Sequence, residues 1–280
     1  MSQVIHPESP AEVASLARRI VAFPLTLLFV EFVVISVVSV LIGMGWEQLD
    51  VARNTPEKAL GALLMAGGTI ALWKACKRWL EREPDHELGW TGAGRELGAG
   101  LVAGLAIFSL ATVVVAMMGG FEVLGVRGAG QIWTMLAIAV VSGTVEEVLF
   151  RGVLFRHIEA MIGSWAALVL TSAFFGIAHI GNEDASWFSS FAIAVEAGIM
   201  LGAAYMLTRR LWLAMGIHAG WNFAQGWIFS IPVSGGETPL GLLITRRVGP
   251  DWLTGGAFGL EASVVALVVA TLFGLGLLWR

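Results

Sequence analysis

Long apolar stretches limit what this chain can fold into. A helix needs about 20 mostly apolar residues to cross a bilayer, and eight stretches of the 280-residue chain approach that length. Charged residues make up only 14% of the chain, against roughly 25% in a soluble domain. The sequence therefore predicts an all-α, polytopic integral membrane helix bundle. The expected spans are 20–44, 59–75, 98–118, 131–155, 163–181, 187–207, 211–231 and 258–279.

The basic residues predict how this bundle is oriented. If eight spans alternate, four groups of basic residues fall on one side of the membrane, and the other side is mainly acidic, with Arg246 and Arg247 as the exception. Cytoplasmic loops are enriched in Lys and Arg, so we expect both termini in the cytoplasm of a cell with a bacterial-type inner membrane. The four groups are Arg18/Arg19, Lys74/Lys77/Arg78/Arg82, Arg151/Arg156 and Arg209/Arg210.

Net charge and cysteine count exclude nucleic-acid binding and two kinds of cysteine site. A net charge of −4 lacks the basic excess of a nucleic-acid-binding protein. The single Cys76 excludes an internal disulfide and a zinc site built from several thiolates. We divide the chain into a cytoplasmic N-terminal segment (1–19), three N-terminal spans with their loops (20–130), a four-helix core (131–231), and a Gly-rich loop followed by the last span (232–280).

The first polar motif lies within the expected span 131–155. Glu146 and Glu147 are adjacent, and Arg151 follows Glu147 by four residues. Such groups are rare in lipid-embedded segments because burying an unpaired charge costs several kcal/mol. On a helix Glu147 and Arg151 share a face and can pair, whereas Glu146 lies about 100° around the axis. The alternative is that Arg151 merely anchors the cytoplasmic end of a span.

Two further motifs lie in later spans. Phe175 precedes His179 by one helical turn, and His218 precedes Asn222 by the same spacing. The imidazole of His218 and the carboxamide of Asn222 share a helix face and can together stabilise an oxyanion. Taken singly, His179 also fits an interfacial residue near a helix end, and the other pair fits hydrogen bonding between helices. Taken together, the three motifs predict a hydrolytic site inside the membrane.

These motifs resemble the signature of the CPBP family, the CAAX-protease and bacteriocin-processing (Abi-type) membrane proteins, which include the type II CAAX prenyl endopeptidases. The family pattern is Glu-Glu-x-x-x-Arg, Phe-x-x-x-His and His-x-x-x-Asn/Asp on successive membrane helices. The chain matches it without a departure, over a core of about 131–231. The resemblance implies an intramembrane endopeptidase that cleaves a membrane-associated protein or peptide. The matching residues are Glu146, Glu147, Arg151, Phe175, His179, His218 and Asn222.

The expected mechanism uses a water molecule as the nucleophile. Glu146 would act as general base, His179 would orient the water or assist proton transfer, and His218 with Asn222 would stabilise the tetrahedral oxyanion. Three residues would support this set by positioning it: Glu147, Arg151 and Phe175.

Three alternatives stay open at this stage. Glu146, His179 and His218 form a set that could bind zinc with one position free for water. A non-catalytic scaffold or immunity protein would need no Glu146. A proton-coupled transporter would account for the mid-span carboxyls Glu31 and Glu196, which we leave outside the catalytic set. The sequence specifies neither the oligomeric state nor whether the substrate is prenylated.

Overall fold

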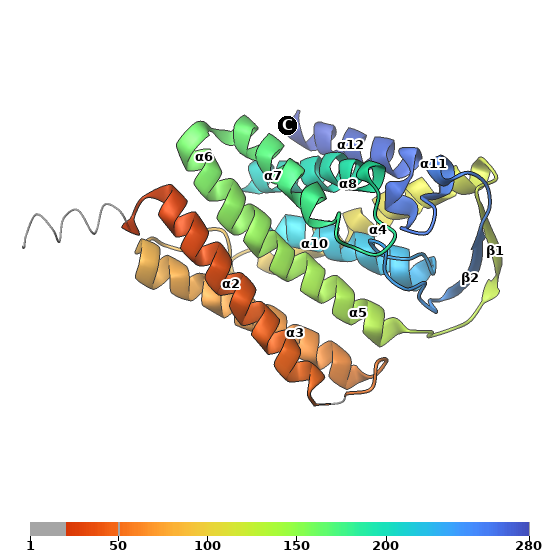
Figure 1. Cartoon of the computed structure of the whole chain (residues 1–280), viewed down its shortest axis with the longest axis horizontal. Coiled ribbons are helices and arrows are strands. Elements are labelled where there is room, and N and C mark those ends of the chain that lie inside the picture. Colours follow the sequence, from red (N-terminus) through yellow and green to blue (C-terminus); the bar gives the residue numbers. More distant parts are fainter. Residues whose placement is uncertain (1–20, 50, 280) are drawn as a thin grey trace, which may run out of the picture.

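The computed structural model describes residues 21–49 and 51–279, and it is 71% helical. The predicted cytoplasmic segment 1–19, with Arg18 and Arg19, lies outside the described residues. Helices α2 (Pro24–Glu47) and α3 (Pro56–Ala75) lie side by side at one flank of the molecule (Figure 1). The further helices are η1 (Cys76–Glu81), α4 (Ala93–Met117), α5 (Ile132–Val141), η2 (Ser142–Glu146), η3 (Val148–Phe155), α6 (Arg156–Ile162), α7 (Ser164–Ala178), α8 (Trp187–Ile193), η4 (Ala194–Gly198), α9 (Ile199–Thr208), α10 (Leu211–Phe223), η5 (Ala224–Ile228), α11 (Asp251–Thr254), η6 (Leu260–Ala262) and α12 (Val264–Leu278).

Several of these elements join into longer helices. Five helices within the described residues are long and apolar enough to cross a membrane: Pro24–Trp46, Pro56–Glu81, Ala93–Met117, Ile132–Ile162 and Trp187–Thr208. Helices α7 and α12 are shorter apolar helices. Each of the eight expected spans therefore contains a helix, and the chain is a helical integral membrane protein. The count of eight spans and the cytoplasmic termini stay predictions.

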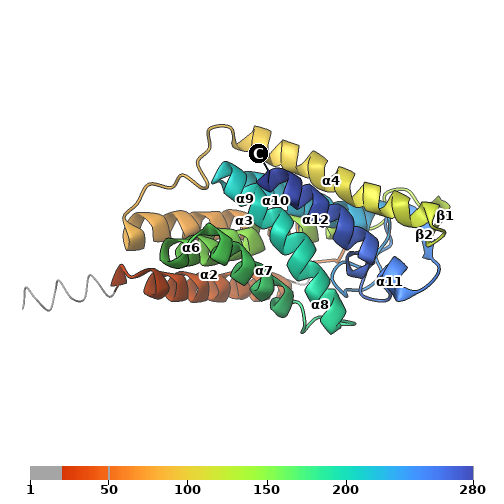
Figure 2. The same ribbon diagram turned by 90° about the horizontal axis from the view of Figure 1, so that it is seen from above.

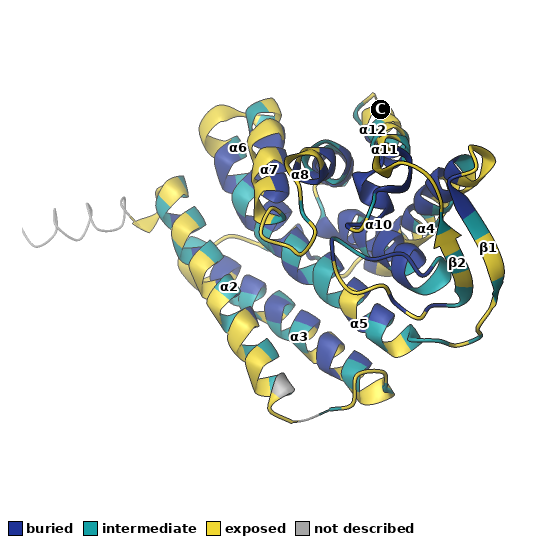
Figure 3. Cartoon of the chain, turned by 45° about the vertical axis from the view of Figure 1, so that its right-hand side comes forward, coloured by how far each residue is buried: buried dark blue, intermediate teal, exposed yellow. Residues whose placement is uncertain are grey.

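Outward-facing apolar side chains support a lipid-embedded bundle. Only 22% of the apolar window in Pro24–Trp46 is buried within the protein, and exposed residues line the outer face of α2 (Figure 3). Leu60, Leu63 and Leu64 of α3 are exposed as well. Such faces are stable in hydrocarbon and unfavourable in water. The exposed side chains of α2 include Phe29, Val37, Val40 and Leu41.

A small antiparallel sheet departs from the expected all-helical fold. Strand β1 (Phe121–Val126) pairs with β2 (Leu243–Arg247), and Phe121 lies opposite Arg247. The side chain of Arg246 donates hydrogen bonds to Glu122 across the pair. Both strands are short segments between the apolar stretches and lie far apart in the sequence, so periodicity within one segment does not reveal their pairing.

Wide helical turns are the second departure from the expected regular spans. Residues 142–146 and 148–155 adopt π-helical turns, as do 194–198 and 224–228. Such turns occur often at functional sites. Here the first two carry Glu146 and Arg151, the third carries Glu196, and the last begins two residues after Asn222.

Glycines let α4 and α10 pack with their backbones in contact. A Cβ atom on Gly104 of α4 would lie 2.1 Å from the carbonyl oxygen of Ile217, and one on Gly220 of α10 would lie 2.4 Å from that of Leu101. Gly100 and Gly216 make equally close approaches within the same contact. Small residues spaced four apart are the usual means of close packing between membrane helices. This contact fixes the position of α10, which carries His218 and Asn222.

We predict that Gly104→Ala destabilises the protein by about 1–3 kcal/mol, because the added methyl group forces two helix backbones apart. The measurement is the free energy of unfolding in detergent, followed by tryptophan fluorescence. Gly98→Ala on the same helix is the matched control, since a Cβ atom there has nothing within 4 Å. Equal effects of the two substitutions would contradict the importance of this close contact.

Candidate functional site

Three helices contribute to one pocket. Glu146 ends η2 in the middle of the long helix Ile132–Ile162, His179 caps α7, and His218 and Asn222 lie on α10. All four side chains line the same pocket, which we call the candidate pocket. The other residues lining it are Ile138, Ser142, Asn182, Glu183, Val233, Ser234, Gly235 and Gly236.

His179 lies at the end of a helix that is shorter than the expected span. The expected span 163–181 places His179 near the far end of a full-length membrane helix. In the structure α7 has 15 residues and ends at Ala178, and His179 is its C-cap residue. From this helix end His179 lines the candidate pocket together with the mid-helix residue Glu146.

A buried ionic network lies beneath the candidate pocket. The Nη1 atom of Arg151 donates to Oε1 of Glu147 at 2.9 Å, as the four-residue spacing predicts. The same oxygen lies 2.8 Å from Nδ1 of His218. Both Glu147 and Arg151 are almost fully buried, and Arg151 also donates to the carbonyls of Ala197 and Gly198. The network therefore joins three helices and fixes the orientation of the His218 ring.

Glu146 occupies a different environment from its neighbour Glu147. Its side chain is 32% exposed, and its Oε2 atom lies 3.9 Å from Nε2 of His218, beyond hydrogen-bond distance. That oxygen has no hydrogen-bond partner in the protein. The carboxylate of Glu147 is thus hydrogen-bonded within the buried network. The carboxylate of Glu146 lines the pocket, where it can accept a proton.

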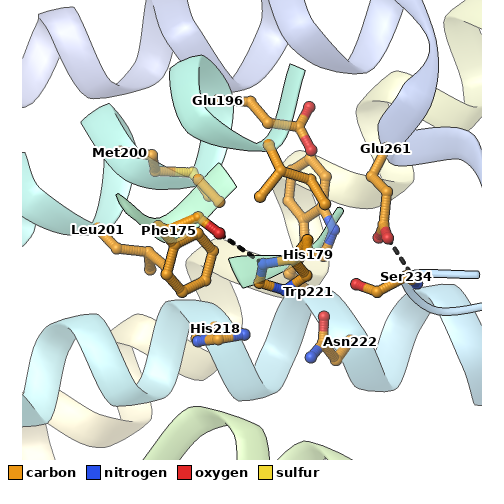
Figure 4. A pocket seen from close by; sticks show the side chains of 12 residues that line it. Phe175, His179, Glu196, Met200, Leu201, His218, Trp221, Asn222, Ser234 and Glu261 are labelled. Carbon is orange, nitrogen blue, oxygen red and sulfur yellow. Dashed lines mark hydrogen bonds between the residues drawn. The ribbon is translucent and has the colours of Figure 1, made fainter. Parts of the chain in front are cut away.

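The ring of His179 is held by its own helix. Nδ1 lies 2.7 Å from the carbonyl oxygen of Phe175. A carbonyl only accepts, so Nδ1 donates the hydrogen, and in the neutral form of the ring Nε2 is then the acceptor. The Phe175 ring packs against the imidazole at a centroid distance of 4.7 Å, and the guanidinium of Arg151 lies 4.9 Å from the centre of the same ring. Figure 4 shows His179 between Phe175 and Trp221, above His218 and Asn222.

Ser142 is a pocket residue that the motifs do not contain. Its Oγ accepts a hydrogen bond of 2.8 Å from Nδ2 of Asn222 and donates to the carbonyl of Ile138. This contact uses one amide hydrogen of Asn222 and leaves the second available. Ser142 lies four residues before Glu146 in the same helical segment. Its hydrogen bond with Asn222 is seen only in the fold, because the two residues are 80 positions apart in the sequence.

Two more carboxyl groups lie next to the site. Glu196 and Glu261 are buried and line a small cavity together with His179, His218 and Asn222 (Figure 4). Glu261 accepts a hydrogen bond of 2.5 Å from the backbone N–H of Ser234 and so holds that loop over the pocket. The Oε2 atom of Glu196 has no partner. In the sequence Glu196 is a lone mid-span carboxyl and Glu261 belongs to no motif, so neither is recognisable there as a neighbour of the site.

The donor atoms of the expected zinc set are more widely spaced than those of another cluster of potential ligands. Among the described residues, one set of three donors lies within 4.8 Å of one another, and it is Glu31, Glu81 and His157 rather than Glu146, His179 and His218. That other set already contains a cation, because Arg156 donates to Glu81 at 2.6 Å and to Glu31 at 3.3 Å. No cofactor is established for this chain.

One comparison with known proteins matches the segment that carries the site. Residues 128–224 match the family model described as type II CAAX prenyl endopeptidase Rce1-like. Residues 128–224 form a domain of the CPBP/CAAX protease family. This domain covers about a third of the chain and contains all three motifs. No curated protein and no solved structure matches the chain.

The family assignment agrees with the sequence motifs and with the membrane helices. The chain therefore carries a domain of a membrane protease family. Several elements lie outside this CAAX-protease domain: the strands β1 and β2 and the helices α2, α3, α4 and α12.

Proposed function

We propose that this chain is an intramembrane endopeptidase that hydrolyses a peptide bond by means of a glutamate-activated water molecule. The observation that carries the proposal is the convergence of Glu146, His179, His218 and Asn222 on one pocket. A carboxylate with an unbonded oxygen, an imidazole with a free acceptor nitrogen, and two groups able to donate are the parts that peptide hydrolysis needs.

The first step is attack of water on the scissile carbonyl. The water lies between Glu146 and Nε2 of His179, and Glu146 takes its proton as the new C–O bond forms. The carbonyl oxygen, on which negative charge develops, accepts hydrogen bonds from Asn222 and His218. Each such donor is worth about 2.7–4 kcal/mol in comparable sites. Collapse of this intermediate breaks the C–N bond, and the proton held by Glu146 passes to the leaving amine.

Glu147 and Arg151 act as positioning residues in this mechanism. The bond from His218 Nδ1 to Glu147 leaves Nε2 directed toward the pocket and toward Glu146. An imidazolium at this position donates from both ring nitrogens and so can bind the oxyanion. Arg151 compensates the buried charge of Glu147, which would otherwise be costly.

The substrate we propose is a membrane-associated protein or peptide. A mostly apolar groove between α2, α3 and α5 ends at Ser142 and Glu146. An apolar segment of a substrate can occupy this groove while the bond to be cut reaches Glu146. The groove is lined by Ile42, Gly43, Trp46, Lys58, Gly61, Ala62, Met65, Ala137, Ile138 and Val141.

Purified protein in liposomes that contain a membrane-anchored reporter peptide tests this function. We expect cleavage with and without a strong chelator, because Glu146, His179 and His218 share the pocket but their donor atoms are not all within 4.8 Å of one another. Metal analysis of the same sample provides the control. Activity that is lost with the chelator and restored by zinc would overturn the metal-free mechanism, and absence of any peptide cleavage would overturn the proposed function.

A further inference from the structure

A small cavity lies next to the candidate pocket, and we call it the inner cavity. It is formed where the helix Trp187–Thr208 packs against α10 and α12, and α12 lies beside α9 in this part of the fold (Figure 2). The inner cavity and the candidate pocket share four lining residues: His179, His218, Asn222 and Ser234. The two spaces therefore adjoin one another at the proposed catalytic residues.

The inner cavity contains two carboxyl groups that the proposed mechanism does not use. Glu196 of η4 and Glu261 of η6 are both buried, and they line the cavity from different helices (Figure 4). Glu261 accepts a hydrogen bond from the backbone N–H of Ser234, whereas the Oε2 atom of Glu196 has no hydrogen-bond partner in the protein. A buried polar atom without a partner is costly, and a bound water molecule is a common way to satisfy it.

The size and the lining of the inner cavity both suit water. Its volume is about 30 Å³, and a cavity needs only about 10–15 Å³ to hold one water molecule. Polar cavities hold water, whereas purely apolar ones stay dry. Glu196, Glu261 and His179 supply polar atoms to this cavity. The rest of its wall includes the buried side chains of Met200 and Trp221, which separate it from the outside of the bundle.

The position of the inner cavity matters because hydrolysis consumes one water molecule in each turnover. Glu146 lines the candidate pocket and not the inner cavity, whereas His179 lines both. The attack position between Glu146 and His179 therefore borders the inner cavity on the His179 side. A peptide bound in the candidate pocket displaces water from that pocket, but a water molecule in the inner cavity can still move to the attack position without passing the substrate.

We propose that the inner cavity is a water-binding site that supplies the hydrolytic water molecule, and that Glu196 retains this water. The inference rests on the proposed function for the use of the water, and on the cavity and the unpartnered carboxyl oxygen for its binding. Glu196 is a positioning residue in this role, because it acts on the scissile bond only through the water that it holds.

X-ray footprinting of the full chain in detergent tests whether water occupies the inner cavity. An X-ray pulse converts bound water into hydroxyl radicals, which oxidise the adjacent side chains, and mass spectrometry then locates the added oxygen. Met200 lines the inner cavity, whereas Met215 lies in a hydrophobic cluster, and each is only 2% exposed. We expect oxidation of Met200 and none of Met215. Equal oxidation of the two methionines would overturn the proposal.

Substitutions of Glu196 test its part in holding the water. Glu196→Leu removes the polar group, so we expect loss of Met200 oxidation and a lower kcat for peptide cleavage, with KM unchanged because the substrate does not contact this cavity. Glu196→Gln keeps a group that can hydrogen-bond to water and should restore Met200 oxidation and most of the lost kcat. Absence of Met215 oxidation in each variant shows that the core is still folded.

Two results with Glu196→Leu would contradict the proposal. Oxidation of Met200 at the parent level would show that Glu196 does not retain the water, and an unchanged kcat would show that the inner cavity does not supply it. Footprinting needs no proteolysis, so its outcome is independent of the proposed function. If Met200 is oxidised as expected but the parent chain cuts no membrane-anchored reporter peptide, the proposed function fails while the water site stands.

Discussion

Glu146→Gln is expected to abolish peptide cleavage, with a loss of about 10²–10⁴-fold in kcat. Glutamine has nearly the same shape as glutamate but cannot take a proton from water. Because the Oε2 atom of Glu146 has no hydrogen-bond partner in the protein, the substitution removes no internal hydrogen bond of that atom. The variant should therefore fold and bind substrate as the parent protein does. The measurement is single-turnover cleavage of a membrane-anchored peptide in liposomes, together with binding of the same peptide.

Glu122→Gln is the matched control for this prediction. It removes one carboxylate of similar chemistry from an exposed ion pair between Glu122 of β1 and Arg246 of β2, where a salt bridge contributes little stability. We expect its cleavage rate to equal that of the parent. A Glu146→Gln variant that retained full biological activity would favour a scaffold or immunity role over an enzyme.

The sequence predicted which residues pair along one helix at the candidate site, but not how the three motifs come together. The four-residue spacings of Glu147 with Arg151, and of His218 with Asn222, follow from helix periodicity alone, and the structure has each pair on one helix. The same reasoning could not bring the motifs together, because which side chains share a pocket depends on how the helices pack. The expected span continues to Gly181, whereas α7 ends at Ala178.

Some features of the site and the fold could not be predicted from the sequence, because they depend on contacts between segments that lie far apart in the chain. Ser142 and Glu261 are single polar residues without a motif, and their importance appears only through Asn222 and the Ser234 loop. The strands β1 and β2 pair across more than a hundred residues of sequence. Likewise, the apolar groove that ends at Glu146 depends on where α2 and α3 pack against α5. No local sequence pattern specifies this packing.

The buried pair of Glu147 and Arg151 leads to the second prediction. Arg151→Met is expected to lower the free energy of unfolding by about 3–5 kcal/mol, because it leaves a buried carboxylate without its main counter-charge. It also removes the hydrogen bonds to the carbonyls of Ala197 and Gly198. The measurement is denaturant unfolding in detergent, with cleavage activity recorded on the same sample.

The double variant Glu147→Gln/Arg151→Met separates stability from catalysis. With both charges removed, most of the lost stability should return, because the cost of Arg151→Met lies mainly in the uncompensated carboxylate. A glutamine oxygen can still accept the hydrogen bond from His218 Nδ1, so the ring keeps its orientation. Activity should nevertheless stay below that of the parent, since a neutral partner stabilises an imidazolium less than a carboxylate does. Full recovery of activity would show that Glu147 positions His218 by hydrogen bonding alone, and that its charge has no part in the mechanism.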